Sequence, residues 1–334
     1  MAKVAVVGNT TWGTTLALLT VRAGSNVVIW TRTQDEADSI NAARQDLHAL
    51  PEISLPDSIS HTGSIEKALD GAAMVMLAVP SQSMRENTKK IVGYLANSML
   101  IVSAAKGIEE DTGKRMSEVI AEEIAHRYHQ NICALSGPNL SGEIVKNMPS
   151  TTVIAAQNTD IAKKAQQILS SKLFRVYVSE DVIGVELGGA LKNIIALSAG
   201  MSDGLGYGDN SKSALITRGL AEISRLGIAM GANPFTFDGL AGLGDLITTC
   251  ASTLSRNHYV GFELAKGKKL DEITLSMKGI AEGIRAAIVA RQLALKLGVE
   301  MPITDQVYNV LYEGISVKQA MLNLMERELR HERA

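Results

Sequence analysis

Short apolar runs and longer polar stretches with helical periodicity alternate along the first half of the chain. The predicted strands cover residues 3–7, 26–30, 73–79, 99–105, 131–135 and 151–156. The predicted helices between them cover residues 12–23, 35–41, 83–95 and 114–129. Several of the apolar runs lack alternation, which is typical of strands buried on both faces. This order of strands and helices predicts a parallel sheet wrapped by helices, the doubly wound α/β class.

The pattern changes after about residue 178, where strand-like runs nearly disappear. Stretches rich in Ala, Leu and Ile with helical spacing follow at residues 182–201, 212–230, 257–265, 284–297, 304–312 and 317–329. We therefore expect two domains, an α/β domain over residues 1–180 and an all-α domain over residues 181–334. No Pro/Ser-rich linker separates the halves, which favours close packing with a cleft at their junction.

Composition narrows the class of protein. Lys and Arg number 33 and Asp and Glu number 35, so the formal charge of −2 provides no global basis for binding nucleic acid. The two cysteines, Cys133 and Cys250, cannot form a disulfide framework, which favours a reducing compartment. No apolar stretch approaches roughly 18 residues, so no membrane span is expected. The histidines and cysteines lack the spacing of metal ligands, so we predict no metal. The cysteine count and the lack of a span together predict a cytoplasmic location.

A strand, a glycine turn and a helix start follow one another near the N-terminus. Gly8 and Gly13 occupy the first and third glycine positions of a dinucleotide-binding fingerprint, and Thr10 occupies the second. Glycines permit the tight turn of that fingerprint, and the helix start accepts a pyrophosphate. The hydroxyls of Thr10 and Thr11 are further candidate phosphate ligands. Because the fingerprint is incomplete, an ordinary strand-to-helix turn is an equal alternative.

The end of the second predicted strand bears on which dinucleotide is bound. A site for NAD usually presents Asp or Glu about 20 residues past the glycines. This strand instead ends with Trp30, Thr31 and Arg32. A guanidinium matches the oxygens of a 2′-phosphate, so the sequence modestly favours NADPH and leaves NADH open. A solvated arginine is the alternative.

Six separated motifs follow one another along the chain. They are Gly8 with Trp12-Gly13, Ala105-Lys106-Gly107-Ile108-Glu109, Ser136-Gly137-Pro138-Asn139, Glu186-Leu187 with Ala190-Leu191-Lys192-Asn193, Gly242-Leu243-Gly244-Asp245-Leu246, and Leu254-Ser255-Arg256-Asn257. Any one of them can arise by chance, but all six in this order are hard to explain otherwise. The chain thus resembles the bacterial type of NAD(P)-dependent glycerol-3-phosphate dehydrogenase over essentially its whole length. It departs from that family at Thr10, Thr11 and Asn139-Leu140-Ser141.

The resemblance implies a Rossmann-like NAD(P)-binding domain and a helical substrate and catalytic domain. It also implies reversible hydride transfer between NAD(P)H and dihydroxyacetone phosphate, which gives sn-glycerol 3-phosphate for glycerophospholipid biosynthesis. Lys192 is similar to the family's proton donor and acceptor. The implied substrate contacts are Lys106, Gly137, Asn139, Lys192, Asp245, Ser255, Arg256 and Asn257. The implied cofactor contacts are Thr11, Trp12, Arg32, Lys106, Ser141, Arg256, Ile280 and Glu282.

Lys192 suits this chemistry because the alkoxide-like oxygen formed by hydride transfer needs a proton or a cation beside it. At helical spacing its face is shared with Gly188, Gly189, Ala196 and Ala199. We expect these small neighbours to leave the ammonium open to a small ligand. Partial burial and nearby cations are expected to lower its pKa towards the working pH. A lysine that extends from an amphipathic helix into solvent is the alternative.

Four further residues are candidates on chemical grounds. Ser255 can cap a new helix, whose free N–H groups would hold a phosphate together with Arg256. Asp245 follows a glycine turn, and we expect it to bond a substrate hydroxyl and to orient Lys192, although it can also serve as a helix N-cap. Lys106 directly follows a predicted strand, at the carboxyl edge where open α/β sheets bind ligands, and can polarise the ketone.

Two other functions stay open from the residues alone. One is a related two-domain dehydrogenase that acts on another hydroxy acid or sugar. The other is a nucleotide-sensing module that binds NADPH without oxidising it. The presence of Lys106, Lys192, Asp245 and Arg256 together favours the enzyme. The sequence leaves a homodimer open.

Overall fold

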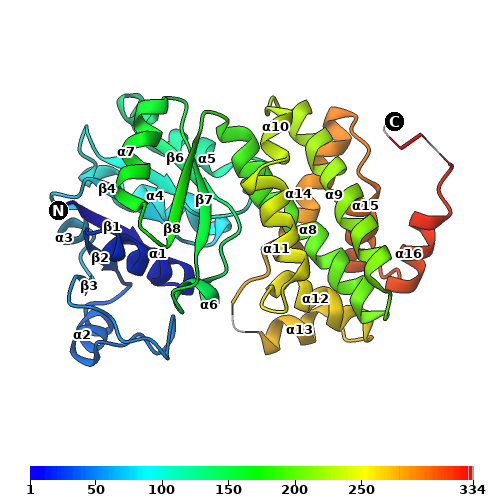
Figure 1. Ribbon diagram of the computed structural model, residues 1–334, viewed down its shortest axis with the longest axis horizontal. Helices are drawn as coiled ribbons and strands as arrows, with labels where there is room; N and C mark the ends of the chain where they lie inside the picture. Colours follow the sequence, from blue (N-terminus) through cyan, green and yellow to red (C-terminus); the bar gives the residue numbers. More distant parts are fainter. Residues whose placement is uncertain (278, 330, 333–334) are drawn as a thin grey trace.

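The computed structural model describes residues 1–277, 279–329 and 331–332. They form two bodies that lie side by side along the longest axis of the molecule (Figure 1). The first body is a sheet covered by helices, which ends at Ser179, and the second is the set of helices that begins at Val182. The predicted fold class, a Rossmann-like α/β half followed by a helical half, is therefore confirmed.

Eight strands form one sheet in the order β3-β2-β1-β4-β5-β6-β7-β8. The strands are β1 (Lys3–Val7), β2 (Asn26–Trp30), β3 (Ile59–Thr62), β4 (Met74–Leu77), β5 (Leu100–Ser103), β6 (Ile132–Ser136), β7 (Ser150–Ala155) and β8 (Phe174–Ser179). Neighbours are parallel from β3 through β6 and again between β7 and β8, but β7 is antiparallel to β6. The prediction of a parallel sheet is wrong at β7. This strand begins at the end of the sheet where β6 finishes, so the two run in opposite directions.

Two strands, β3 and β8, were absent from the predicted elements, and both lie at the edges of the sheet. β3 has the short, largely polar sequence Ile-Ser-His-Thr. β8 alternates buried and exposed residues at its start, with Phe174 and Val176 buried and Arg175 and Tyr177 exposed. The continuous apolar runs that predicted the inner strands are not needed at an edge, where less of the strand is covered.

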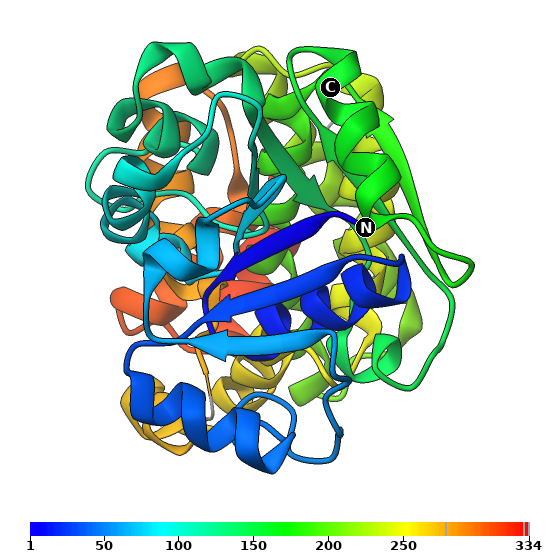
Figure 2. The same cartoon turned by 90° about the vertical axis from the view of Figure 1, so that its left-hand side faces the viewer.

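Helices cover both faces of the sheet (Figure 2). The helices of this half are α1 (Thr11–Arg22), α2 (Gln34–Ala43), α3 (Ile65–Leu69), α4 (Met84–Ile91), α5 (Met116–Glu123), α6 (Ser141–Ile144) and α7 (Thr159–Leu169). On one face, Val4 and Val6 of β1 pack in a core with α1 and α7. On the other, Ala5 and Val7 pack in a core with α3, α4 and α5. Successive strand residues point to opposite faces, so burial on both sides requires an apolar residue at every position.

The second half is built around one central helix, α8. Its helices are α8 (Val182–Gly204), α9 (Asp209–Ala229), α10 (Pro234–Phe237), α11 (Asp245–Ala251), α12 (Arg256–Ala265), α13 (Leu270–Ser276), α14 (Glu282–Leu297), α15 (Pro302–Tyr312) and α16 (Val317–Met325). α8 packs against α9, α11, α12 and α14 and is buried along nearly its whole length. By length and composition it is apolar enough to cross a membrane, but it forms the core of this half, and no span is indicated.

All the helices predicted for the second half are present. The largest difference is at α16, which ends at Met325 and not at residue 329. The short helices α10, α11 and α13 were not predicted. Each has seven residues or fewer, and so carries too little of the helical period to stand out from the sequence.

Candidate active site

The turn after β1 brings two backbone segments close together. Gly8 has φ +119°, a conformation that favours glycine, and a Cβ there would lie 2.6 Å from the Ala78 carbonyl oxygen. Thr10 is the N-cap of α1, and its hydroxyl accepts from the Gly13 N–H at 3.0 Å and donates to the Ala78 oxygen at 3.0 Å. The prediction that this hydroxyl binds phosphate is wrong, because its one proton is already donated within the protein.

The start of α1 fits the pyrophosphate of a dinucleotide. Thr11 is the first residue of the helix and its side chain is exposed, and the first N–H groups of a helix attract anions. The turn lies between β1 and β4, where the strand order reverses, which is the place where open α/β sheets bind dinucleotides. The Trp12 indole donates to the Ala104 oxygen at 3.1 Å and so fastens α1 to the end of β5. The residues present therefore suit NAD(P).

Arg32 lies just beyond the end of β2. Because β1 and β2 are parallel, it is at the same edge of the sheet as the turn after β1. Its side chain is exposed, and within the described part of the chain it makes no hydrogen bond or ion pair. A free guanidinium at this edge is available to a 2′-phosphate. The preference for NADPH stays a prediction.

Lys192, Asp245 and Lys106 meet at the junction of the two halves. Lys192 lies in the middle of α8, Asp245 is the first residue of α11, and Lys106 follows β5. The Lys192 ammonium donates to Asp245 Oδ1, and the Lys106 ammonium donates to Asp245 Oδ2 at 2.7 Å. One buried carboxylate thus bridges two ammonium groups, one from each half. Asp245 is not a helix N-cap, because Gly244 occupies that position, and the predicted contact between Asp245 and Lys192 is present.

Burial determines the proton affinity of Lys192. The residue is 5% exposed, and burial lowers the pKa of its ammonium to about 7. Asp245 opposes that shift, and the positive charge of Lys106 adds to it. Removal from water disfavours the charged form of a lysine. A lysine with a pKa near neutrality can both give and take a proton, and the predicted direction of the shift is confirmed.

The glycines that precede Lys192 act differently from the prediction. A Cβ at Gly188 would lie 2.5 Å from the Ala241 oxygen, and one at Gly189 would lie 2.4 Å from Ser136 Oγ. The absence of side chains lets the turn before α11 and the end of β6 approach α8 closely. The expectation that small neighbours leave the ammonium open is therefore wrong, since they allow the packing that buries it.

Sequence reasoning missed Thr249, which completes the surroundings of the ammonium. Lys192 donates to Thr249 Oγ1 at 2.6 Å, and the Thr249 hydroxyl donates to the Asp245 backbone oxygen at 2.6 Å. Thr249 lies four residues after Asp245 on the same helix. That spacing places two side chains on one helix face, so the motif that contains Asp245 already held a signal for Thr249.

Asn193, for which no role was predicted, bonds to Asn257, and together the two amides link three helices next to Lys192. Its side-chain oxygen accepts from Asn257 Nδ2 at 2.8 Å, and its own nitrogen approaches the Gly189 oxygen at 3.3 Å. The Asn257 oxygen in turn accepts from the Gly283 N–H at 3.0 Å. Asn257, an implied substrate contact, is therefore buried and links the starts of α12 and α14 to α8.

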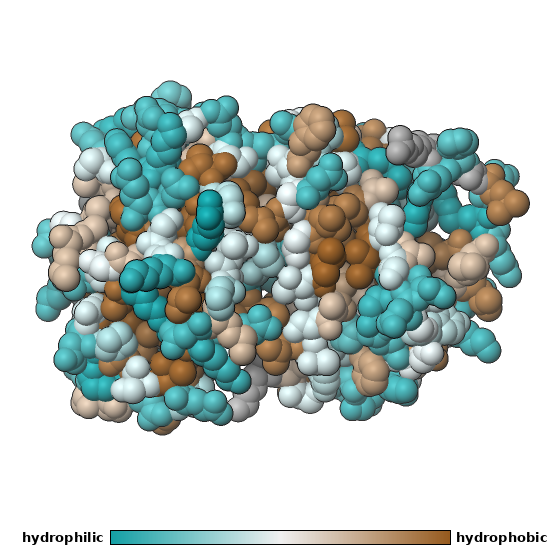
Figure 3. All heavy atoms as spheres, in the orientation of Figure 1, coloured by the Kyte–Doolittle hydropathy of each residue, from teal (hydrophilic) through white to brown (hydrophobic). Residues whose placement is uncertain are grey.

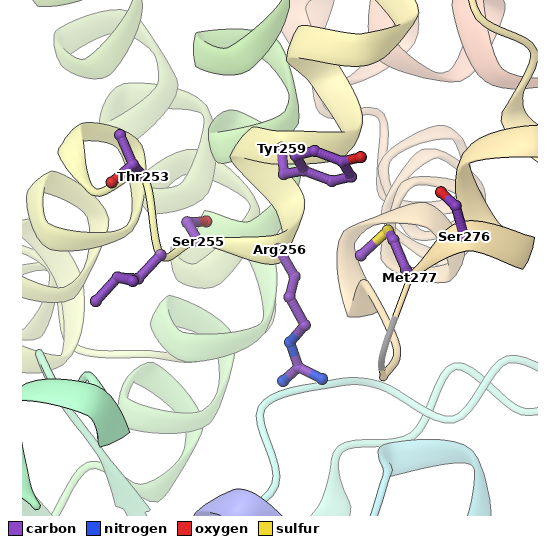
Figure 4. A pocket seen from close by; sticks show the side chains of 7 residues that line it. Thr253, Ser255, Arg256, Tyr259, Ser276 and Met277 are labelled. Carbon is purple, nitrogen blue, oxygen red and sulfur yellow. The ribbon is translucent and has the colours of Figure 1, made fainter. Parts of the chain in front are cut away.

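The start of α12 carries two further predicted substrate contacts. Ser255 is the N-cap, and its hydroxyl accepts from the His258 N–H at 3.2 Å, as predicted. Arg256 extends from the helix start towards loops of the sheet half and borders a cavity of about 300 Å³ (Figure 4). Its guanidinium makes no hydrogen bond or ion pair with the residues that the structure describes. This helix start therefore presents a free cation.

The segment after β6 contains Gly137, Asn139 and Ser141. The Gly137 oxygen accepts from the Lys106 ammonium at 2.7 Å. The Asn139 side chain turns towards β7, where its oxygen accepts from Thr152 Oγ1 at 2.9 Å. This amide holds the segment against β7, and the substrate contact implied for Asn139 stays a prediction. Ser141 is the first residue of α6, which packs beside α1.

The two late cofactor candidates differ in their surroundings. Ile280 is exposed. Glu282 begins α14, and its two oxygens accept from the Ser81 N–H at 3.1 Å and from the Ser81 hydroxyl at 2.6 Å. Ser81 follows β4 at the edge where a dinucleotide would lie. Glu282 thus links the helical half to the cofactor edge of the sheet.

No group of three or more His, Cys, Asp or Glu side chains is placed to hold a metal ion within residues 1–277, 279–329 and 331–332. Lys106 and Lys192 are instead paired through the shared carboxylate of Asp245. The geometry therefore provides a proton donor, a second cation and two open anion sites, which suits reduction of a phosphorylated ketone by a nicotinamide.

Two family models match nearly the whole chain. The one described as NAD-dependent glycerol-3-phosphate dehydrogenase N-terminus matches residues 3–162, and the one described as the C-terminus of the same enzyme matches residues 181–322. A relative from Dehalococcoides mccartyi (strain ATCC BAA-2266 / KCTC 15142 / 195), named glycerol-3-phosphate dehydrogenase (NAD(P)+), is 52% identical over 100% of this chain and 93% of its own.

Another relative with that name, from Exiguobacterium sp., is 46% identical over 99% of this chain and 97% of its own. A crystal structure of glycerol-3-phosphate dehydrogenase from Coxiella burnetii superposes with a TM-score of 0.91 and 34% identity, covering 98% of this chain and 99% of that chain. The two halves and their order thus have full-length counterparts. The chain belongs to the NAD-dependent glycerol-3-phosphate dehydrogenase family.

Proposed function

We propose that this chain transfers hydride reversibly between NAD(P)H and dihydroxyacetone phosphate and so forms sn-glycerol 3-phosphate. The observation that carries the proposal is the buried ammonium of Lys192, held by Asp245 at the junction of the two halves beside the ammonium of Lys106. A proton donor and a second cation in one buried cluster are what ketone reduction requires.

When bound, the nicotinamide supplies the hydride. Lys192 gives a proton to the substrate oxygen during reduction and removes one during oxidation, which a pKa of about 7 permits near neutral pH. Lys106 adds a positive charge beside the same oxygen and stabilises negative charge that develops there. Asp245 orients both ammonium groups and bonds a substrate hydroxyl.

The two open anion sites hold the charged ends of the ligands. Arg256 and the N–H groups at the start of α12 bind the phosphate of the substrate. Thr11 and Trp12 contact the pyrophosphate of the cofactor at the start of α1, and Arg32 meets the 2′-phosphate of NADPH. NADPH is modestly favoured and NADH is also used. Gly137, Asn139, Ser255 and Asn257 are further substrate contacts, and Ser141, Ile280 and Glu282 are further cofactor contacts.

The test is an assay of the purified chain. With dihydroxyacetone phosphate, we expect it to consume NADPH and NADH, as followed by nicotinamide absorbance, and to leave α-keto acids unreduced. Activity on a keto acid and none on the phosphate ester would assign the chain to another hydroxy acid. Binding of NADPH without oxidation by any small ketone would identify a sensing module.

Each half forms one functional domain, and the whole enzyme has one cellular role. Residues 1–180 form the NAD(P)-binding domain, and residues 181–334 form the substrate and catalytic domain. The product is the backbone of glycerophospholipids, so the enzyme serves their biosynthesis in the cytoplasm. The two free buried cysteines, Cys133 and Cys250, are consistent with a reducing compartment.

We also propose that the chain forms a homodimer through the far end of the helical half. A cavity of about 1130 Å³ opens between α9, α15 and α16, with Leu322, Met325 and Leu329 at its wall. Figure 3 shows apolar surface at this end of the molecule. Arg218 and Glu328 line the same cavity, and in a self-complementary two-fold interface opposite charges on one patch can pair across it. Sedimentation should show a dimer that Met325→Glu converts to a monomer, whereas a monomeric wild type would contradict the dimer.

A further inference from the structure

No acidic residue stands at the end of β2, but the carboxylate of Glu36 lies at the same edge of the sheet, where a dinucleotide would bind. The strand ends at Trp30 and is followed by Thr31 and Arg32. In the first turn of α2, Glu36 accepts a hydrogen bond from Asn9 Nδ2 through its Oε1 at 3.0 Å. Asn9 belongs to the turn after β1. The contact therefore joins the two segments between which a dinucleotide fold holds the adenosine ribose.

Glu36 has bonding capacity left for a ligand. The residue is half-buried, and its Oε2 makes no hydrogen bond or ion pair with the described residues. Asn9 faces it with its nitrogen, which is the orientation in which an amide and a carboxylate attract. The contact holds the Glu36 side chain against the turn and leaves one oxygen free at the site of the ribose.

The charges around this edge act in opposite directions on the two cofactors. Arg32 is exposed and unpaired within the described part of the chain, whereas Lys90, 5.4 Å from the centre of the Trp30 ring, is paired with Glu86 at 2.6 Å. A 2′-phosphate is attracted by Arg32 and repelled by Glu36. A 2′-hydroxyl can donate to Glu36 and gains little from Arg32.

We propose that Glu36, positioned by Asn9, binds the 2′-hydroxyl of NADH and sets the balance between NADH and NADPH against Arg32; this rests on the proposed use of NAD(P)H. Glu36 then takes the role of the acidic residue that follows β2 in sites for NAD, from one helical turn farther along the chain. Each nucleotide thus has one favourable partner at the ribose, and NADPH also meets one unfavourable charge.

The test measures nucleotide binding directly. Calorimetric titrations compare the wild type with Glu36→Gln, using NADP+ and NAD+ and also adenosine 2′,5′-bisphosphate and adenosine 5′-monophosphate, which carry and lack the 2′-phosphate. Glutamine keeps the size of the side chain and removes its charge. We expect NADP+ to bind more tightly and NAD+ more weakly, so that the ratio of the two Kd values changes about tenfold.

Asp38→Asn is the matched control. Asp38 lies on the same helix, is exposed and accepts from Gln34 Nε2 at 2.8 Å. Loss of this charge should change the ratio by less than about twofold because of screening. An unchanged ratio in Glu36→Gln, or an equal change in Asp38→Asn, would overturn the role of Glu36 and leave the proposed cofactors intact. A wild type that binds neither nucleotide would overturn both.

Discussion

The site has two ends, the junction of the two halves and the cofactor edge of the sheet. They differ in whether their polar side chains are already hydrogen-bonded within the protein. At the junction, Lys192, Asp245 and Lys106 are bonded to one another, and Asp245 and Lys192 are buried. At the cofactor edge, the Thr11 and Arg32 side chains are exposed and make no hydrogen bond with the described residues. The difference teaches that the chain preorganises its proton chemistry and leaves the phosphates of the cofactor to groups that pair only with the ligand. Substitutions at the first end should abolish turnover, and those at the second should change selectivity.

Among substitutions at the junction, Lys192→Ala should have the largest effect. Loss of a general acid and base should lower turnover by about 10²–10⁴-fold. Lys106 still pairs with Asp245, so no buried carboxylate is left alone; the loss of the buried side chain should lower the melting temperature but keep the fold, and the Kd for NADPH should change little. Steady-state assays with dihydroxyacetone phosphate and calorimetric binding of NADPH measure the two quantities.

A lysine elsewhere in the helical half serves as the control for that substitution. Lys212 pairs with Asp203 at 2.6 Å, and Lys212→Ala should keep nearly full turnover. Near-full turnover in Lys192→Ala as well would refute the assignment of Lys192.

Asp245→Asn should have the next largest effect. It leaves two ammonium groups without their shared carboxylate, and breaking a buried pair costs about 3–5 kcal/mol of stability. Because Asp245 raises the pKa of Lys192, its loss also lowers that pKa and leaves the amine neutral at pH values where reduction needs its proton. We expect turnover to fall about 10²-fold.

The measurements for Asp245→Asn are kcat and thermal unfolding, with Thr249→Val as the comparison. That variant removes one hydroxyl from the same ammonium and keeps the charge. An Asp245→Asn protein as stable and as active as Thr249→Val would contradict the bridging role of Asp245.

Arg32→Ala acts at the open end and should alter selectivity alone. Loss of a charged partner for the 2′-phosphate should lower the ratio of kcat/KM for NADPH to that for NADH by about tenfold, with kcat nearly unchanged. Arg175→Ala, on the far edge strand beside Tyr177, is the matched loss of an exposed arginine. If both variants shift the ratio equally, Arg32 has no specific part in cofactor choice.

Ser81→Ala probes the contact that joins the two ends and should have the smallest effect. It removes the hydroxyl bonded to Glu282 and keeps the backbone N–H bond to the same carboxylate. We expect kcat/KM to fall by about threefold. Ser83→Ala is the control, since that hydroxyl donates to the nearby Pro80 oxygen at 3.0 Å. Equal activity of both variants would show that the link does not contribute.

Parts of the fold could be predicted because burial on both faces demands apolar residues. The bounds of β1 and β2 match the prediction at both ends. β3 and β8 lie at the edges, where polar positions are tolerated and the apolar run disappears. The direction of β7 could not be predicted, because residues buried in parallel and antiparallel pairs are equally apolar.

The candidate site shows the same division. Motifs in sequence order pointed to Lys106, Lys192 and Asp245, which the fold brings together. They did not indicate that Gly189 buries the lysine, because close approach of β6 to α8 depends on tertiary packing. Glu36 also escaped notice, since it lies on a helix and reaches the turn after β1 only through Asn9.

The central claim is that a buried Lys192 with a pKa lowered to about 7 moves the proton. Single-turnover rates of hydride transfer, measured in both directions across about pH 5–9, test it most directly. Reduction needs the ammonium, so its rate should fall as the pH rises through about 7, whereas oxidation needs the neutral amine and should accelerate over the same interval. Lys192→Ala should remove both inflections. Flat profiles in the wild type, or inflections that persist without the lysine, would contradict the account.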